Sequence, residues 1–260
     1  MRNHCQVVVL SFLQAGGRIT ASDILYRGLR LPGDLFRGPD LSGVGYVQRF
    51  VDFGGAITGG PQGPLVATLP DGIRFEAKPA KLLDTLALLV ERFVDDEYAW
   101  LDAAGRVVVD IGANVADSVV YFARRGAAYV YGYEPDPATF AAALRNLELN
   151  RFRNADVAPL AVQRDTSDGQ TSFADVLGRA CQEHPGLPII CKIDCEGCEY
   201  EIFDSGGAAP PGLDRVSQIM IEYHWRSPET LLAALEGLGF HVETSPGAPG
   251  VGWIRAQKPR

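Results

Sequence analysis

From residue 106 onward, short apolar runs alternate with segments of helical periodicity. This alternation is typical of a parallel sheet built from βαβ units. It predicts strands at 106–111, 128–134, 155–162, 188–194, 216–223, 239–244 and 251–256, and helices at 115–125, 136–149, 171–182, 197–204 and 228–238. A Gly/Pro-rich turn, SPGAPG, joins the last two strands, so we expect these to form an antiparallel hairpin at one sheet edge.

The pattern before residue 79 is different. Residues 1–75 are rich in Gly and Pro and show no sustained helical period, which predicts an irregular, partly β-stranded extension. Within it, LVATLPDGIRFEA predicts a hairpin, because two alternating strands flank Asp71-Gly72. Residues 79–94 have apolar side chains at helical spacing behind Pro79 and predict a helix that leads into the core. We therefore expect an N-terminal extension at 1–78, a candidate cap on the substrate side, and a main domain at 79–260.

The apolar run from Val7 to Leu13 is too short to span a bilayer and is preceded by a single basic residue, Arg2. We interpret it as a buried helix or strand rather than a signal peptide. The sequence thus predicts a cytoplasmic protein without a membrane span.

Length and charge narrow the function classes. With 260 residues, 47% of them hydrophobic, the chain can bury one large α/β core. With a formal net charge of -8, the chain does not show the excess of basic residues that is usual in nucleic-acid binders. We therefore expect a small-molecule partner and no nucleic acid.

The cysteines are unevenly placed. Cys5 and Cys181 are isolated, whereas Cys191, Cys195 and Cys198 fall within eight residues. A structural zinc site needs four ligands, and no second CxxC or HxxxH accompanies the cluster. The interpretation we favour is small buried side chains at a strand end, in a reducing compartment.

The segment VVVDIGANVADSVVYFA predicts a buried strand, a turn at Gly112 and Asn114, and the start of a helix. Glycine allows a ligand to approach the backbone, and the helix start offers free N–H groups to an anion such as a carboxylate. The turn lacks the GxGxxG pattern, which disfavours a dinucleotide loop. A plain strand–helix turn in an unrelated α/β protein is the alternative for this segment alone.

The next strand ends in YGYEPDP, which places Glu134 about twenty residues after Gly112. An acid at this point in a Rossmann-like unit accepts hydrogen bonds from both ribose hydroxyls, and Asp110 ends the first strand in a matching way. Without a phosphate-binding glycine pattern, a nucleoside with an amino-acid tail fits better than NAD. These features predict S-adenosylmethionine as the cofactor.

Three segments, VVDIGANVADSVVYFARRGA, YGYEPDPATFAAALRNLELN and IICKIDCEGCEYEIF, occur in the order found in the FkbM family of methyltransferases, and IEYH at 221–224 also matches. The chain resembles this family from about residue 65 to 240. The resemblance implies a seven-stranded, Rossmann-like class I methyltransferase sheet whose last hairpin is antiparallel. It also implies a hydroxyl on a sugar, glycolipid or polyketide-like molecule as the methyl acceptor.

The resemblance also implies roles for individual residues. The methionyl part of the cofactor would lie against Gly112, Ala113 and Asn114, the ribose against Glu134, and adenine near Pro159. The full cofactor-binding set that we expect is Asp110, Gly112, Ala113, Asn114, Asp117, Glu134, Pro135, Leu160, Ala161 and Asp194. The chain departs from the family pattern at Ala116, where glycine is usual, and at Cys195 and Cys198.

The candidate catalytic residues come from two strands that the fold makes neighbours. In KIDCEGCEYE, Lys192, Asp194 and Glu196 alternate, and in IEYH so do Glu222 and His224. We expect Asp194, Glu196, Glu222 and His224 to meet at the carboxyl edge of the sheet, where ligands bind in open α/β folds. For any one of them alone, a solvated loop charge is an equally good interpretation.

In this interpretation His224 is the general base, because imidazole titrates near neutrality, and Glu222 or Glu196 orients it or the acceptor. The same residues could hold Mg²⁺ or Mn²⁺, but a divalent metal is disfavoured because it would lie beside the cationic sulfonium. Rival functions are N- or C-methylation of another small molecule, a base-flipping nucleic-acid methylase, and a non-catalytic cofactor-binding module.

Overall fold

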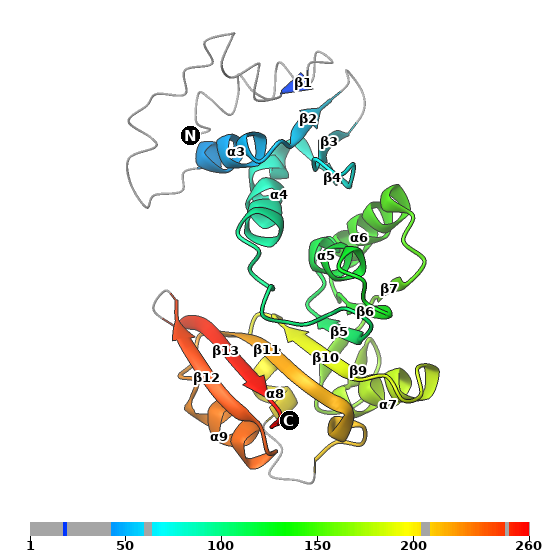
Figure 1. Ribbon diagram of the computed structural model, residues 1–260, viewed down its shortest axis with the longest axis vertical. Helices are drawn as coiled ribbons and strands as arrows, with labels where there is room; N and C mark the ends of the chain where they lie inside the picture. The colour runs from blue at the N-terminus through cyan, green and yellow to red at the C-terminus, as the bar shows by residue number, and fades with distance from the viewer. Residues whose placement is uncertain (1–17, 20–42, 60–63, 204–208, 248–249, 260) are drawn as a thin grey trace. The chain divides into compact units, whose positions relative to one another are not determined.

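The computed structural model describes residues 18–19, 43–59, 64–203, 209–247 and 250–259 (Figure 1). The chain divides into two compact units, Met1–Tyr98 with Glu148–Asn150, and Ala99–Leu147 with Arg151–Arg260. The apolar run at 7–13 and part of the SPGAPG turn lie outside the described residues.

The first unit contains a four-stranded antiparallel sheet in the order β1 (Arg18–Ile19), β2 (Ala56–Thr58), β3 (Leu65–Thr68) and β4 (Arg74–Ala77). The hairpin predicted around Asp71-Gly72 is confirmed as β3–β4, with Thr68 opposite Arg74. Gly72 has a φ of 88°, which is why glycine suits this turn.

A helix, α3 (Gly43–Asp52), lies in the stretch for which the sequence predicted no helical period. That prediction was wrong. Val47, Phe50 and Val51 are buried at helical spacing and form the apolar face of α3. Two glycines in its first turn, Gly43 and Gly45, have low helix propensity and hid the period.

The helix predicted at 79–94 is confirmed, with irregular ends. It begins with a 3₁₀ turn at Pro79–Lys81 (η2), continues as α4 (Leu82–Leu89), and ends in a π-helical turn at Val90–Val94 (η3). Leu82, Leu86 and Leu89 are buried. All of it falls in the first unit, whereas a boundary at residue 78 would group it with the second.

The second unit is built on a seven-stranded sheet in the order β12-β13-β11-β10-β5-β6-β7. The strands are β5 (Val107–Ile111), β6 (Tyr129–Tyr133), β7 (Ala155–Ala158), β10 (Ile189–Ile193), β11 (Val216–His224), β12 (His241–Pro246) and β13 (Val251–Gln257). The first five are parallel to one another, and β13 is antiparallel to both β11 and β12. This is the Rossmann-like class I methyltransferase topology, and the fold predicted from the sequence is confirmed.

The third strand is shorter than predicted. Instead of running to residue 162, β7 ends at Ala158, and β8 (Ala161–Gln163) pairs with β9 (Gln170–Ser172) in a separate two-stranded sheet. Pro159 cannot donate a ladder hydrogen bond, which explains the interruption. The next helix, α7 (Phe173–Glu183), starts after Ser172, whose hydroxyl accepts the N–H of Asp175 at 3.0 Å.

The remaining helices are α5 (Asp117–Arg124), α6 (Pro137–Asn150), α8 (Cys198–Phe203), the 3₁₀ turn η4 (Leu213–Arg215) and α9 (Glu229–Gly237). Buried residues of α7, α8 and α9 form one core cluster with alternate strand positions such as Val107, Val109 and Ile111. On the opposite face α5 packs closely on β6, since a Cβ at Gly132 would lie 2.9 Å from Val119 Cγ2. Asp110 of β5 belongs to this second face because its side chain alternates with those in the cluster.

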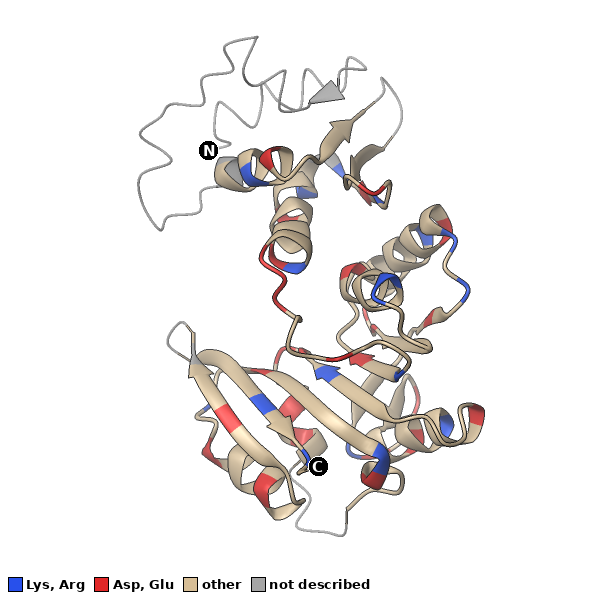
Figure 2. Ribbon diagram, in the orientation of Figure 1, with Lys and Arg blue, Asp and Glu red and all other residues tan. Residues whose placement is uncertain are grey.

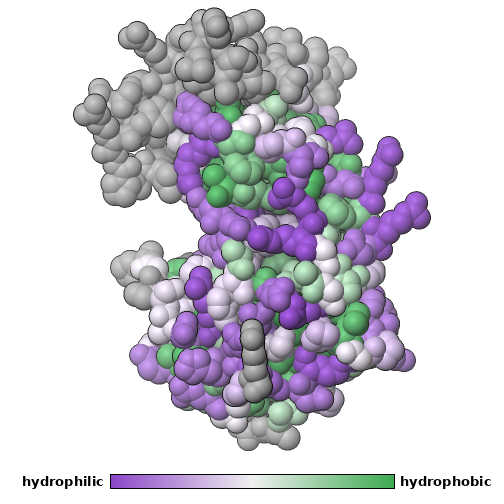
Figure 3. Space-filling view, viewed as in Figure 1, coloured by the Kyte–Doolittle hydropathy of each residue, from purple (hydrophilic) through white to green (hydrophobic). Residues whose placement is uncertain are grey.

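Lys and Arg are interspersed with Asp and Glu along the described ribbon (Figure 2). Hydrophilic residues are prominent on the face of the described chain seen in Figure 3. Among the described helices, none has the length and apolar character needed to cross a bilayer.

Candidate active site

Five strand ends lie side by side across the sheet. One row of paired residues crosses β7, β6, β5, β10 and β11. It consists of Ala158, Tyr133, Ile111, Ile193 and Ile221, each paired with the next. The residues that follow this row are Pro159, Glu134, Gly112, Asp194 and Glu222. The predicted cofactor segments and Asp194 therefore leave the sheet at the edge where Glu222 and His224 end β11.

The turn after β5 depends on Gly112. Its φ is 80°, and a Cβ there would lie 1.7 Å from the carbonyl oxygen of Asp194. The N–H groups of Gly112 and Ala113 both donate to Tyr133 O, at 3.0 and 2.9 Å. A side chain at Gly112 would therefore force the β5 turn away from the end of β10.

Asn114 and Ala116 in the same turn also have left-handed backbone, with φ of 47° and 65°. Glycine adopts this region without cost, which gives a physical reason for the glycine usual in the FkbM pattern at the Ala116 position. The chain here holds an alanine, fully buried, in the conformation that favours glycine.

Lys192 lies beneath this turn and also reaches the catalytic candidates, since its Nζ is 3.7 Å from Asp194 Oδ2. It is opposite Asp110 in the β10–β5 register, and the two buried side chains form an ion pair at 3.1 Å. Its ammonium also donates to Gly112 O at 2.6 Å. Burial raises the pKa of Asp110, and the charge of Lys192 opposes that shift. The pair fixes the strand end that carries the turn.

Glu134 is 9% exposed and already has two backbone partners. Its Oε2 accepts the N–H of Asn114 at 3.0 Å and its Oε1 accepts that of Asp136 at 2.9 Å. Burial raises the pKa of Glu134, and both hydrogen bonds counteract this. A carboxylate has about four lone-pair sites, so two more hydroxyl donors can be accepted.

The other predicted cofactor residues lie nearby in sequence and on the same edge. Asp117 is buried at the first position of α5. Pro135 is exposed directly after Glu134, and Leu160 and Ala161 are half-buried after the end of β7.

The four predicted catalytic residues do come together. Ligand atoms of Asp194, Glu222 and His224 lie within 4.8 Å of one another, an arrangement that could hold a metal ion. His224 Nε2 is 3.9 Å from Asp194 Oδ1 and 3.8 Å from Glu196 Oε2. His224 is 6% exposed, whereas the Glu196 side chain is 71% exposed. The cluster thus has one buried imidazole under a solvent-facing carboxylate.

A fifth residue, Glu199 of α8, was missed in the sequence. It is fully buried, its Oε1 accepts the backbone N–H of His224 at 2.8 Å, and it lies 3.4 Å from His224 Nδ1. Its Oε2 accepts the N–H of Gly197 at 2.8 Å. The sequence showed only an acid in the first turn of a short helix, which is normally solvated.

Glu199 changes the protonation expected for His224. The contact with Glu199, together with the charges of Glu196 and Asp194, raises the pKa of His224 from 6.5 to about 9, against the effect of burial. The expectation that this imidazole titrates near neutrality was wrong. At neutral pH it is mostly an imidazolium.

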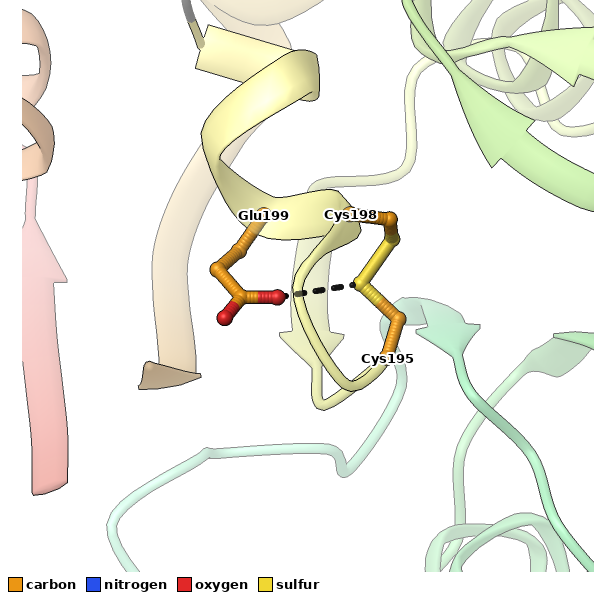
Figure 4. A group of neighbouring side chains, drawn as sticks. All are labelled: Cys195, Cys198 and Glu199. Atoms are coloured by element: carbon orange, nitrogen blue, oxygen red, sulfur yellow. Dashed lines mark hydrogen bonds between the residues drawn. A yellow bond between two sulfur atoms is a disulfide. The ribbon is translucent and has the colours of Figure 1, made fainter. Parts of the chain in front are cut away.

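Cys195 and Cys198 form a disulfide next to this cluster (Figure 4). This corrects the expectation of small reduced side chains at the strand end. The third cysteine of the cluster, Cys191, is a free buried thiol, and burial raises its pKa.

Trp225 was also missed. It is 72% exposed and directly follows His224, with 6.2 Å between the two ring centroids. Its backbone is left-handed, with a φ of 65°. It provides an exposed aromatic surface beside the cluster.

Comparison with known proteins gives distant similarities. No family model matches the chain. It is 25% identical over 210 residues to the tRNA wybutosine-synthesizing protein 2 homolog of Rattus norvegicus, which covers 74% of this chain and 46% of the rat protein. It is 27% identical over 105 residues to uncharacterized protein 65 of a Sulfolobus islandicus filamentous virus, covering 40% of this chain and 54% of the viral protein. The chain thus spans about half the length of the curated relatives it matches.

Among solved structures, an rRNA methylase from Streptococcus thermophilus aligns with a TM-score of 0.43 and 13% identity, over 67% of this chain and 93% of that one. The M. capricolum TrmK structure, a complex with S-adenosyl-homocysteine, aligns with a TM-score of 0.44 and 14% identity, over 65% and 69% of the two chains. The fold assignment rests on the strand order and directions described above.

Proposed function

We propose that this chain is an S-adenosylmethionine-dependent methyltransferase of the FkbM type, which methylates a hydroxyl group of a small cytoplasmic acceptor such as a sugar, glycolipid or polyketide-like molecule. The observation that carries the proposal is the row of strand ends. It brings the Gly112 turn and Glu134 to the same sheet edge as the cluster of Asp194, Glu222 and His224.

The residues at the first three strand ends fit this cofactor. Glu134 keeps acceptor capacity for the two ribose hydroxyls, and the turn at Gly112 brings backbone close to where a methionyl group would lie. Leu160 offers a half-buried apolar side chain to adenine. When bound, the cofactor supplies an electrophilic methyl group on a cationic sulfonium.

Activation of the acceptor is assigned to the cluster. The acceptor hydroxyl must lose a proton as it attacks, and His224 would take it while Asp194, Glu196 and Glu222 hold the acceptor. Because the pKa of His224 is raised to about 9, only its minor neutral form acts near pH 7. The turnover rate should then rise about tenfold per pH unit below 9.

We favour a metal-free reaction, since a dication within this cluster would repel the nearby sulfonium. The test is direct. EDTA should leave the rate unchanged, whereas activity lost on chelation and restored by Mg²⁺ or Mn²⁺ would reassign Asp194, Glu222 and His224 as metal ligands.

An RNA acceptor is the second candidate. The observation in its favour is the 25% identity to a protein named for tRNA wybutosine synthesis, and the exposed ring of Trp225 would suit a stacked base. The formal net charge of -8 favours the small-molecule acceptor. N- or C-methylation and cofactor binding without catalysis are the other outcomes.

Two measurements test the proposal. Calorimetry should show S-adenosylhomocysteine binding that Glu134→Ala weakens roughly thirtyfold or more, through lost hydrogen bonds to ribose, while Glu148→Ala on the exposed side of α6 has no effect. Equal affinity in both variants would remove Glu134 from the site. Transfer of a labelled methyl group to total tRNA and not to hydroxylated small molecules would replace the proposed acceptor by RNA.

A further inference from the structure

The proposed proton transfer from the acceptor does not use the Cys195–Cys198 disulfide. It closes a short loop in which both intervening residues, Glu196 and Gly197, have left-handed backbone, with φ of 55° and 112°. Both cysteines are partly exposed, in contrast to the fully buried thiol of Cys191. An exposed disulfide is open to attack by an external thiolate, whereas a buried one is not.

A buried carboxylate faces this disulfide. Glu199 Oε2 lies 3.5 Å from Sγ of Cys195, the contact drawn in Figure 4. A disulfide sulfur has no hydrogen to donate across it, but a Cys195 thiol would have one. Reduction would therefore create a hydrogen bond to a charged acceptor, and Glu199 should stabilise the dithiol relative to the disulfide.

We propose that Cys195 and Cys198 form a thiol–disulfide exchange site whose partner is a dithiol reductant. A thiolate of the reductant attacks Sγ of Cys198, because the charge of Glu199 repels an anion approaching Cys195. The S–S bond breaks, and Cys195 leaves as a thiolate that takes the proton lost by the reductant.

The second thiolate of the reductant then attacks the reductant sulfur joined to Cys198. Cys198 is released and takes the second proton, and the reductant closes its own disulfide. Two electrons and two protons pass to the protein, and no further co-reactant is needed.

Glu199 also connects this site to His224. Its Oε1 accepts the His224 N–H and faces Nδ1, while its Oε2 faces Cys195. A Cys195 thiol that donates a hydrogen bond to Glu199 would partly neutralise the carboxylate charge that stabilises the protonated imidazole of His224. This step rests on the proposed function, and it predicts that reduction raises methyl-transfer turnover at neutral pH.

The exchange itself is tested without any methyl donor. The folded protein is equilibrated in buffers of reduced and oxidised dithiothreitol or glutathione and quenched in acid. It is then unfolded and alkylated with N-ethylmaleimide, and its mass is measured by mass spectrometry. Of the five cysteines, two should become reactive together as the buffer becomes more reducing, and Cys195→Ser or Cys198→Ser should abolish that paired transition. A pair that stays oxidised in every glutathione buffer would be structural and would overturn the proposal, as would two thiols already free without reductant.

The role of Glu199 is tested by Glu199→Gln, with Glu201→Gln as the matched control at an exposed position of the same helix. The first change should shift the equilibrium about three- to tenfold toward the disulfide, the size of one hydrogen bond from a weak donor to a charged group. The control should not. An equal effect of both variants would overturn the assignment.

A second comparison leaves Glu199 intact, in case its variant does not fold. Glutathione disulfide should react at least about tenfold more slowly with Cys195 in Cys198→Ser than with Cys198 in Cys195→Ser, because only Cys195 faces the carboxylate. Equal rates would contradict the proposed order of attack. Stoichiometric Zn²⁺ binding by the reduced protein, lost in Cys195→Ser, would make the pair a metal site with Glu199 and overturn exchange.

The two proposals fail separately. Exchange without methyl transfer to any acceptor would refute the methyltransferase assignment and leave the exchange site standing. Methyl transfer at equal rates in the oxidised and reduced protein would refute the connection through Glu199.

Discussion

Replacing Glu199 by glutamine should lower the pKa of His224 while keeping the shape of the side chain. Glu199 is the largest cause of the rise from 6.5 to about 9, and desolvation of the imidazole acts in the opposite direction. At 3.4 Å, a full charge in a protein site of effective dielectric about 20 contributes several kcal/mol, and each pKa unit corresponds to about 1.4 kcal/mol. Glu196 and Asp194 remain within 4 Å of Nε2, so we expect the pKa of His224 to stay above 6.5 but to fall by at least about one.

NMR titration of the imidazole C–H signals measures this without cofactor or acceptor. The chain has four histidines, and the signal absent from His224→Ala identifies the relevant one. Glu201→Gln should leave its midpoint unchanged. A wild-type midpoint near 6.5, or equal midpoints in wild type and Glu199→Gln, would refute the inferred ion pair.

Three further variants test how the site is held. Gly112→Ala should lower the free energy of unfolding in urea by about 2–4 kcal/mol, because the added Cβ would meet the backbone of Asp194. Gly105 also has a positive φ, 69°, but open space around it, so Gly105→Ala should cost only the backbone strain of about 1–2 kcal/mol. Equal losses in the two variants would contradict the close approach at Gly112. Lys192→Met should cost about 3–5 kcal/mol by removing the buried cation that pairs with Asp110 and lies 3.7 Å from Asp194, and adding Asp110→Asn should recover part of it. The pKa of His224 is higher in the folded state than its ordinary value, so its stabilising contribution should be complete below pH 6.5 and lost as the pH rises to about 9. The difference in unfolding free energy between wild type and His224→Ala should therefore shrink over that window by at most about 3 kcal/mol. A difference that does not change with pH would contradict the shift.

The parallel sheet could be predicted because its strands are short, wholly apolar and separated by helices. The errors arose where one or two residues override the local pattern. Pro159 interrupts the apolar run at 155–162 and ends β7, so the second half of that run forms β8. In α3, the glycines at 43 and 45 obscured the spacing of Val47, Phe50 and Val51, and burial of these side chains is what stabilises that helix.

The meeting of Asp194, Glu222 and His224 could be predicted because alternation along a strand and the order of strands in this fold are fixed by backbone geometry. The position of Glu199 could not, since it depends on how α8 packs against the end of β11. The disulfide likewise depends on the backbone turn between β10 and α8, and a CxxC spacing alone does not distinguish thiols from a bond.

The charges at this sheet edge are unequal, and that inequality bears on what binds there. The acids at and next to the strand ends include Asp110, Asp117, Glu134, Asp194, Glu196, Glu199 and Glu222, and the cations among them include Lys192 and His224. Lys192 pairs with Asp110, donates to the Gly112 carbonyl beneath the turn and lies 3.7 Å from Asp194 Oδ2, so its charge is already shared among these groups. Of the two cations, Lys192 and His224, it is His224 that can lose its charge within an accessible pH range. An edge with this excess of carboxylates favours a positively charged ligand such as a sulfonium, and the attraction should be stronger when His224 is neutral than when it is protonated.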